Sequence, residues 1–200
     1  MALLLEGCQP MGRAKPAPFP ESTGVQISKD TPTAPSPSGP RLALTPGGIG
    51  NLSTATAFRL RAVQAALPGY RVAKASRSSE GQEYPVIIVT AGGDRLLTLH
   101  PGPRQERIHA IVIDQPRAVT GLEHLPGTAF ATVYPLSPPE GCQPGIEEWS
   151  GGVICPAPGI TGLFYRFTGP WNGPDDTLPP STVLADWPLE QIMLIPAAAK

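Results

Sequence analysis

The sequence has few of the features that identify an enzyme, a nucleic-acid binder or a membrane-spanning protein. Charged residues make up only 16% of the 200 residues and the net charge is −1, so the chain has no basic surplus for binding nucleic acid. No run approaches the roughly 18 apolar residues of a spanning helix. Any attachment to a membrane is therefore expected to be through a lipid.

Cysteine and histidine occur only three times each, and their spacing matches no metal or catalytic motif. There is no C-x-x-C, no helical histidine pair and no G-x-S-x-G elbow. We therefore expect no metal, no cofactor and no catalytic residue. The alternative is a small periplasmic hydrolase that uses His100 or His109 with a nearby carboxylate. A histidine in a concave pocket would favour that alternative, whereas a buried or isolated one would favour a binding module.

Glycines Gly47, Gly48 and Gly50 follow a predicted strand and precede a predicted helix. The run matches two glycines of a dinucleotide-binding fingerprint but has Ser53 at the third position. No alternation of strands and helices follows it. The run therefore predicts a tight bend and not a nucleotide site.

The N-terminus matches the end of a lipobox, the motif at which a signal peptidase cleaves and a cysteine is acylated. Leu5 stands three residues before Cys8, and Gly7 stands directly before it. Glu6 is unusual in this motif, and the apolar stretch is shorter than the roughly 7–15 residues of a signal peptide. We expect residues 1–8 to be the remnant of a lipoprotein signal peptide whose start lies upstream, with Cys8 as the lipid attachment site.

If Cys8 carries a lipid, Cys142 and Cys155 remain as one pair. They flank a loop rich in glycine, proline and glutamate, between two segments that resemble strands. A disulfide there would stabilise the fold by about 3 kcal/mol and would fit an exported protein. The alternative is a cytosolic protein with two reduced and unrelated cysteines.

Proline recurs throughout residues 9–40, which favours extended, solvated backbone. We interpret this segment as a flexible tether; the alternative is a proline-rich ligand for a partner domain. Residues 41–196 would form a β-rich periplasmic domain, and residues 197–200 a tail.

Within the domain, short apolar runs alternate with turn residues. Strands are expected at 41–45, 70–76, 85–91, 95–100, 107–114, 163–168 and 189–195. The runs 86–89 and 111–113 are apolar on both faces, which predicts central strands. Leu60, Val63 and Leu67 predict a helix over 57–67, capped by Thr54 or Thr56. Short helices are expected after Thr128 and near 181–187. The predicted fold is mainly β, a curved antiparallel sheet or a β-sandwich, with α+β as the alternative.

Charge is unevenly distributed along the sequence. Residues 57–117 carry nine Lys and Arg against five Asp and Glu, whereas residues 118–200 carry two against eight. We interpret this as charges that pair across neighbouring strands; the alternative is an acidic face for a basic partner.

Several runs resemble the envelope-stress lipoprotein family that is regulated by RpoE (sigma-E), a bacterial domain of unknown function. They are GIGNLSTAT at 48–56, GTAF at 127–130, YRFTGPWNGP at 165–174, LP at 178–179 and LADW at 184–187, together with the pair Cys142 and Cys155. The resemblance covers about residues 41–196. It implies a β-rich lipoprotein of uncharacterised function on the periplasmic side of the outer membrane, and it supplies no catalytic residues. We expect the domain to act as a lipid-anchored binding or structural module of the cell envelope.

Overall fold

The computed structural model describes residues 41–195 apart from positions 46, 54 and 80. The described residues belong to one compact unit, Pro35–Lys200, and are mainly β, as predicted. The predicted signal-peptide remnant (1–8) with Cys8, the tether (9–40) and the tail (197–200) lie outside the described residues.

The described residues form twelve strands, three α-helices and two short 3-10 helices. In chain order these are β1 (Leu42–Thr45), β2 (Gly48–Ile49), β3 (Leu52–Ser53), α1 (Leu60–Ala66), β4 (Arg71–Ser79), β5 (Gln82–Ala91), β6 (Asp94–Pro101), β7 (Ile108–Ile113), η1 (Pro116–Ala118), β8 (Val119–Thr120), α2 (Phe130–Val133), β9 (Gln143–Pro144), η2 (Glu147–Trp149), β10 (Gly152–Pro156), β11 (Leu163–Thr168), α3 (Ser181–Leu184) and β12 (Leu189–Leu194).

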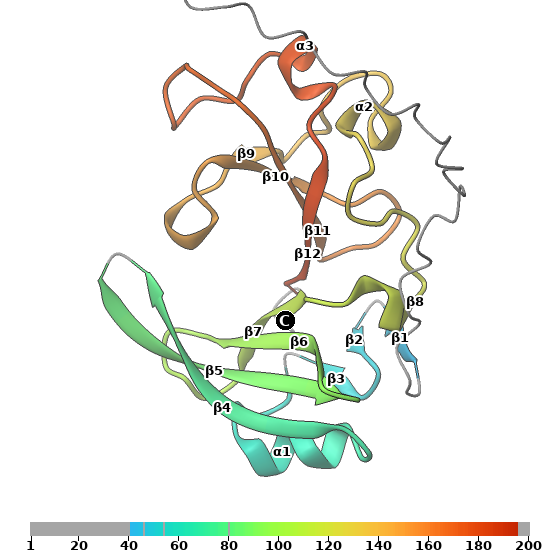
Figure 1. Cartoon of the computed structure of the whole chain (residues 1–200), viewed down its shortest axis with the longest axis vertical. Coiled ribbons are helices and arrows are strands. Elements are labelled where there is room, and N and C mark those ends of the chain that lie inside the picture. The colour runs from blue at the N-terminus through green and yellow to red at the C-terminus, as the bar shows by residue number, and fades with distance from the viewer. Residues whose placement is uncertain (1–40, 46, 54, 80, 196–200) are drawn as a thin grey trace, which may run out of the picture. The chain divides into compact units, whose positions relative to one another are not determined.

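The strands build two sheets (Figure 1). The larger sheet has eight strands in the order β4-β5-β6-β7-β12-β11-β10-β9, and its neighbouring strands are antiparallel. The smaller sheet has the order β3-β2-β1-β8, in which β1 and β8 are parallel. Because β12 pairs with β7, the last strand in the sequence joins the hairpins β4–β7 to the strands β9–β11.

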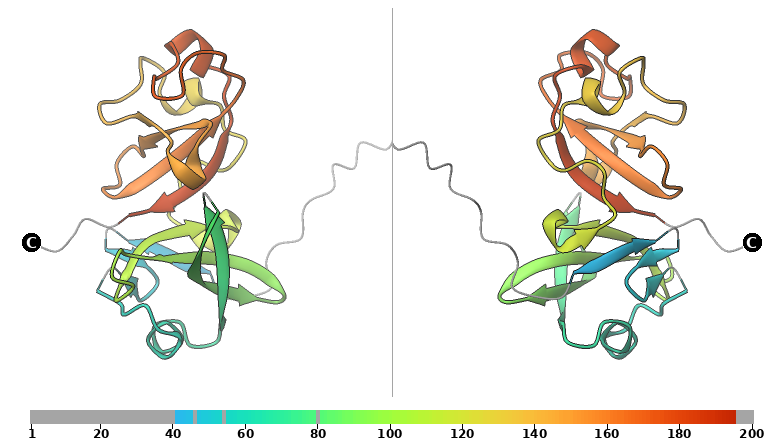
Figure 2. Two further views of the ribbon diagram at one scale, coloured as in Figure 1. Left: turned by 90° about the vertical axis from the view of Figure 1, so that its left-hand side faces the viewer. Right: turned by 90° about the vertical axis from the view of Figure 1, so that its right-hand side faces the viewer.

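One face of the large sheet packs on the main hydrophobic core. Cross-strand partners share a face, and one row of partners crosses six strands in the order Val89, Leu97, Ile113, Ile192, Tyr165 and Cys155. All six side chains are buried. Helix α1 lies beside β4 (Figure 1), and α2 and α3 lie at the end of the unit that holds β9–β12 (Figure 2). The predicted half-buried strand at 163–168 is confirmed by its alternating burial.

The opposite face of the large sheet carries a second, smaller apolar cluster. The neighbouring row of partners runs Ile88, Thr98, Val112, Met193 and Phe164, and Val112, Met193 and Ile154 form the buried cluster. Strand β7 is therefore buried on both faces, as the uninterrupted apolar run at 111–113 predicts.

Helix α1 begins later than the predicted start at residue 57, with Arg59 at the N-cap position. Ala57 forms a β-bridge with Arg107, so extended pairing replaces the predicted first turn. The prediction that Thr56 caps this helix is wrong. The hydroxyl of Thr56 instead accepts a hydrogen bond from the main-chain N–H of Ser53. The other predicted cap, Thr54, lies outside the described residues.

The glycine-rich run after β1 forms the tight β2–β3 hairpin, so the predicted bend is confirmed. A Cβ atom at Gly48 would lie 1.6 Å from the carbonyl oxygen of Leu52, and Gly50 has a φ of +58°. Both positions therefore require glycine because of the local backbone geometry. The hairpin explains these glycines without a bound nucleotide.

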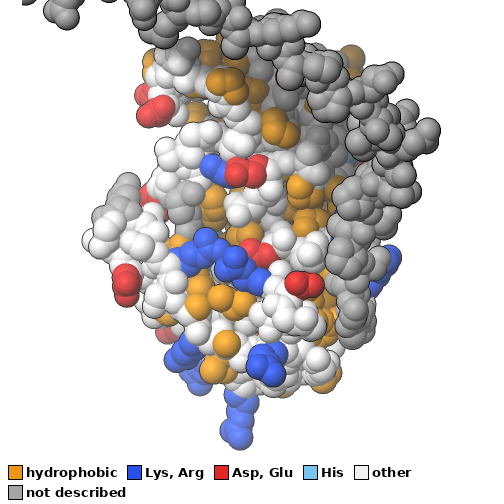
Figure 3. Space-filling model, in the orientation of Figure 1, with side chains coloured by type: hydrophobic (Ala, Val, Ile, Leu, Met, Phe, Trp, Pro, Cys, Tyr) orange, Lys and Arg blue, Asp and Glu red, His pale blue; other side chains and the backbone are white. Residues whose placement is uncertain are grey.

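The two charged segments do not pair with each other among the described residues. The ion pairs found there join Arg95 to Asp114 and Arg166 to Glu190, each within one segment. On the face that Figure 3 shows, Lys and Arg side chains gather over the half that contains α1 and β4–β7. The expected pairing of the two segments is therefore not seen in this part of the chain. No helix in the described range has the length and apolar character needed to cross a membrane.

Candidate functional site

A cleft of about 550 Å³ opens at the end of the second face of the large sheet. Three segments line it: the tip of the β4–β5 hairpin, the β6–β7 hairpin and the 3-10 helix η2. Helix η2 follows β9, at the opposite edge of the sheet from β4. In Figure 1 the loop between β9 and β10 faces the tip of the β4–β5 hairpin. The curved sheet thus brings residues from its two edges to one site.

A β-bulge places both predicted histidines in the cleft. His100 of β6 pairs with Ala110 of β7, but the next residue, Pro101, pairs with Ile108 and leaves His109 as an extra residue. Neighbouring residues of a regular strand point to opposite faces. A bulge bends the strand and re-aims side chains, which accounts for His109 and Ala110 both lining the cleft.

Aromatic rings form a row along the cleft. The buried His100 ring lies between Tyr84 and Trp149, with ring centroids 6.0 Å and 6.4 Å away. Tyr84 and Trp149 are each only half-buried, so part of each ring is accessible from the cleft. Trp149 also packs on the smaller apolar cluster. Trp149 is therefore packed on the core through part of its surface and faces the cleft with the rest.

Two residues of the cleft hold an uncommon backbone conformation. Gln105 has a φ of 53° and Glu147 a φ of 52°, and the described chain has no other non-glycine residue with a positive φ. This left-handed region costs L-residues roughly 1–2 kcal/mol. Both residues line the same cleft, and such conformations cluster at functional sites. The backbone therefore marks the same place as the aromatic row.

Arg166 of β11 holds the η2 turn in place through hydrogen bonds to its main chain. Its Nε donates a hydrogen bond to the carbonyl oxygen of Trp149 at 3.2 Å, and a terminal nitrogen donates to the carbonyl oxygen of Ser150 at 3.0 Å. The guanidinium is also paired with the carboxylate of Glu190. At Gly145, a Cβ atom would lie 1.9 Å from the carbonyl oxygen of Trp149. Arg166 and Gly145 together set the position of the turn.

The described lining of the cleft contains two carboxylates. Glu83 and Glu147 both line it, and neither forms an ion pair with any described residue. No lysine or arginine occurs among the described lining residues. Nor do the described residues contain a group of three or more His, Cys, Asp and Glu that could hold a metal ion. The arrangement offers rings, carboxylates and amides to a ligand of small-molecule size.

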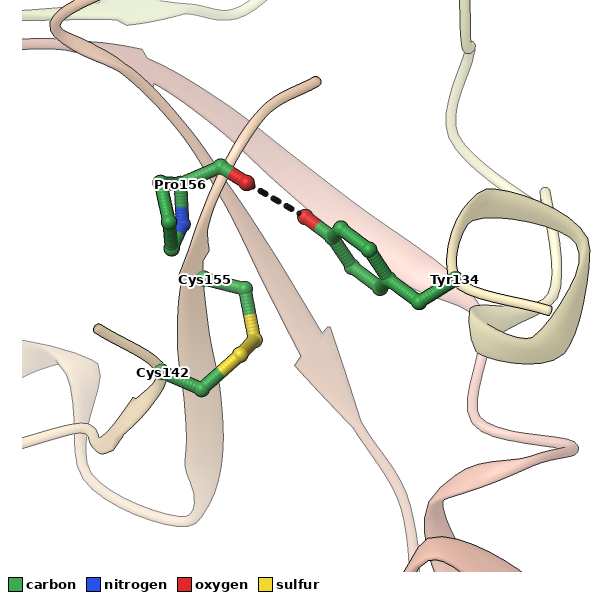
Figure 4. The surroundings of a disulfide bond; sticks show 4 residues. All are labelled: Tyr134, Cys142, Cys155 and Pro156. Carbon is green, nitrogen blue, oxygen red and sulfur yellow. Dashed lines mark hydrogen bonds between the residues drawn. A yellow bond between two sulfur atoms is a disulfide. The ribbon is translucent and has the colours of Figure 1, made fainter. Parts of the chain in front are cut away.

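The predicted disulfide between Cys142 and Cys155 is present, with Cα atoms 4.1 Å apart (Figure 4). Cys155 is fully buried in β10. Beside it, the hydroxyl of Tyr134 donates a hydrogen bond to the carbonyl oxygen of Pro156 at 2.8 Å. Burial, and then the nearby Tyr165, raise the pKa of Tyr134 far above its ordinary value. The disulfide joins the segment before β9 to β10 and so fixes the base of the loop that carries η2.

Sequence reasoning named His100 and His109 but did not place them together. It missed Tyr84, Gln105 and Glu147 as members of a site. The signal available was weak, because exposed glutamine and glutamate residues in loops are common and a bulge leaves no pattern in a single sequence. The predicted lipid site, Cys8, lies outside the described residues.

Comparison with known proteins identifies relatives whose own roles are uncharacterised. Residues 31–195 match the family described as "Protein of unknown function (DUF1131)". The chain is 27% identical over 148 residues to the uncharacterized protein YfeY of Escherichia coli strain K12, covering 73% of this chain and 75% of that protein. The fold is similar to the crystal structure of yfeY from Escherichia coli, with a TM-score of 0.57 and 23% identity over 78% of this chain and 99% of that one.

Proposed function

The chain belongs to the DUF1131 family, and we propose that its domain is a ligand-binding module of the bacterial cell envelope, held at the membrane by a lipid on Cys8. The observation that carries the binding part is the cleft itself. Its volume of about 550 Å³ falls within the usual range of small-molecule sites. It combines accessible aromatic rings with a few polar groups, and the backbone at two lining residues is strained.

The envelope part of the proposal is supported by three features of the chain. Leu5, Gly7 and Cys8 match the end of a lipobox, and the proline-rich residues 9–40 suit a spacer between a lipid and a domain. The disulfide between Cys142 and Cys155 suits an oxidising compartment. Cys155 is fully buried and Cys142 is partly buried, which suits a structural disulfide.

The anchor can be tested by metabolic labelling. A tagged copy at the native locus is grown with a clickable palmitate analogue, and the protein is purified under denaturing conditions. We expect label on the native sequence and none on Cys8→Ser, with the native protein in the membrane fraction. Equal labelling of both proteins, or a soluble unlabelled native protein, would contradict the anchor without affecting the binding site.

The binding module can be tested on the full chain with a panel of saccharides, amines, short peptides and small anions, using NMR chemical-shift changes. We expect at least one class to shift resonances of cleft residues. Trp149→Ala should weaken that binding at least tenfold, because it removes the half-exposed ring. The control is Leu136→Ala, at a side chain that is 97% exposed and not part of the cleft. If no class perturbs the cleft, the binding function is wrong.

A second candidate function is a small hydrolase, which one observation favours: the bulge brings His100 and His109 into the same cleft as Glu83 and Glu147. Histidine and carboxylate are the usual pair for general acid–base catalysis. Fluorogenic ester, amide, phosphate and glycoside substrates would test it. Turnover that falls by two or more orders of magnitude in both His100→Gln and His109→Gln would favour the hydrolase over the binding module.

A further inference from the structure

We propose that the cleft recognises an organic cation, an ammonium or guanidinium group carried on an apolar carbon skeleton. This rests on the proposed binding function and names the chemical class of its ligand. Glu147, from the acidic segment 118–200, lines the cleft together with Glu83 and two half-buried aromatic residues.

The carboxylates of the cleft favour a cation. Glu83 and Glu147 both line the cleft without an ion-pair partner among the described residues. The described lining has no lysine or arginine to neutralise them. An anionic ligand would therefore be repelled by two carboxylates, whereas a cation is attracted by both, and a cation that carries N–H groups can also donate charge-assisted hydrogen bonds to them. Neutral ligands are left as the competing class.

The aromatic row of the cleft also favours a cation. Tyr84 and Trp149 each keep part of the ring exposed beside the carboxylates. The face of an aromatic ring attracts a cation, and tryptophan and tyrosine are the strongest such partners. Rings and carboxylates together are the combination that recognises alkylated ammonium groups, since the rings contact the carbon atoms and the carboxylates balance the charge.

The groups that line the cleft are held in place before any ligand binds. Arg166 fixes the carbonyl oxygen of Trp149 through its Nε, and the charge of Arg166 is already paired with Glu190. Glu147 is held in the left-handed region. Preorganisation of this kind lowers the entropic cost of binding. The strained backbone at Glu147 would therefore contribute to ligand affinity.

The test uses choline and its neutral isostere 3,3-dimethylbutan-1-ol, which has the same shape but no charge. Each is titrated into the full chain by NMR, with Trp149 fluorescence as a second readout. We expect choline to shift cleft resonances and the isostere to bind at least tenfold more weakly. Glu147→Gln and Glu83→Gln should each weaken choline binding several-fold, and the pair together at least tenfold. Glu140→Gln, at an exposed acid that does not line the cleft, is the matched control and should change nothing.

Two further probes distinguish the source of the cation. Spermidine represents free amines, and a capped tetralysine peptide represents the side chains of a protein partner. Tighter binding of either one supports the inference and identifies the source.

Three results would overturn the inference. Equal affinity for choline and its isostere would mean that charge is not recognised. Cleft binding by a neutral saccharide or an anion, with none by any cation, would mean that the ligand class is wrong. In both cases the binding function survives. If no probe of any class perturbs the cleft, the inference and the proposed function fail together.

Discussion

The Nε atom of Arg166 donates a hydrogen bond to the main-chain carbonyl oxygen of Trp149 at 3.2 Å. Arg166 belongs to β11 and Trp149 to η2, a turn that has little regular structure of its own. The bond therefore ties a cleft residue to the rigid sheet.

Replacing Arg166 with alanine should loosen the η2 turn. Two main-chain carbonyls lose their donor, and we expect a loss of about 1–3 kcal/mol of unfolding free energy, together with weaker ligand binding. Urea unfolding measures the first effect and NMR titration the second. Glu190→Gln removes only the exposed partner of the ion pair and should cost less than about 1 kcal/mol. Equal losses in the two variants would show that the ion pair, and not the carbonyl contacts, holds the turn.

Glycine at position 145 should be required for packing. In Gly145→Ala the new Cβ would be 1.9 Å from the carbonyl oxygen of Trp149, so the turn must move. We expect a loss of about 1–3 kcal/mol, measured by thermal or urea unfolding. Gly47→Ala is the matched control, because no atom lies within 4 Å of its Cβ position. A Gly145→Ala variant as stable as Gly47→Ala would mean that the turn is not held against Gly145.

Removal of the disulfide should destabilise the fold while removal of Cys8 should not. The bond closes a loop with a sequence separation of 13 residues, and the double variant Cys142→Ser/Cys155→Ser should lose about 3 kcal/mol. Thermal unfolding with and without reductant measures the effect. Cys8→Ser should unfold as the native chain does, and reductant should lower its midpoint equally. An unchanged midpoint in the double variant would contradict a structural role for the bond.

The substitution Glu147→Gly should relieve backbone strain and weaken ligand binding. Glu147 has a φ of 52°, so Glu147→Gly removes a cost of roughly 1–2 kcal/mol and adds an entropic cost of roughly 0.5–1 kcal/mol. We expect unchanged or slightly increased stability and weaker cation binding. The control is Glu106→Gly, at an exposed residue of the β6–β7 loop without a positive φ, and this variant should lose stability. If Glu147→Gly is the less stable of the two, the strain argument fails.

The stability of the fold should fall in alkaline solution. Burial raises the pKa of Tyr134 and of Tyr165 above the ordinary 10.0, and a hydrogen bond to the main chain of His124 only partly offsets the shift at Tyr165. Since the unfolded chain loses these protons first, the stabilisation is complete below about pH 10 and is lost as the pH rises further. Urea unfolding between pH 8 and 11 measures the slope. Tyr134→Phe should reduce the slope, although it also removes the bond to Pro156; an unchanged slope would assign the effect to other groups.

Much of the fold could be predicted from local patterns. The alternation at Leu163, Tyr165 and Phe167 required a half-buried strand, and the uninterrupted run at 111–113 required a strand covered on both faces. These patterns succeed because burial on a sheet has a period of two residues. The predicted start of α1 was wrong because Ala57 pairs with Arg107. This contact spans about fifty residues of sequence, and no local pattern indicates it.

The site depended on tertiary structure to a greater degree. The sequence alone determined a mainly β domain and a cysteine pair with the right context to form a disulfide, because periodicity and composition act locally along the chain. Only the folded sheet decided that Tyr84, His100 and Trp149 meet in one cleft. Three separate segments supply them, and strand order, a bulge at His109 and the hold of Arg166 on the η2 turn together set their distances. Such relations are long-range packing, which a linear pattern of residue types does not encode.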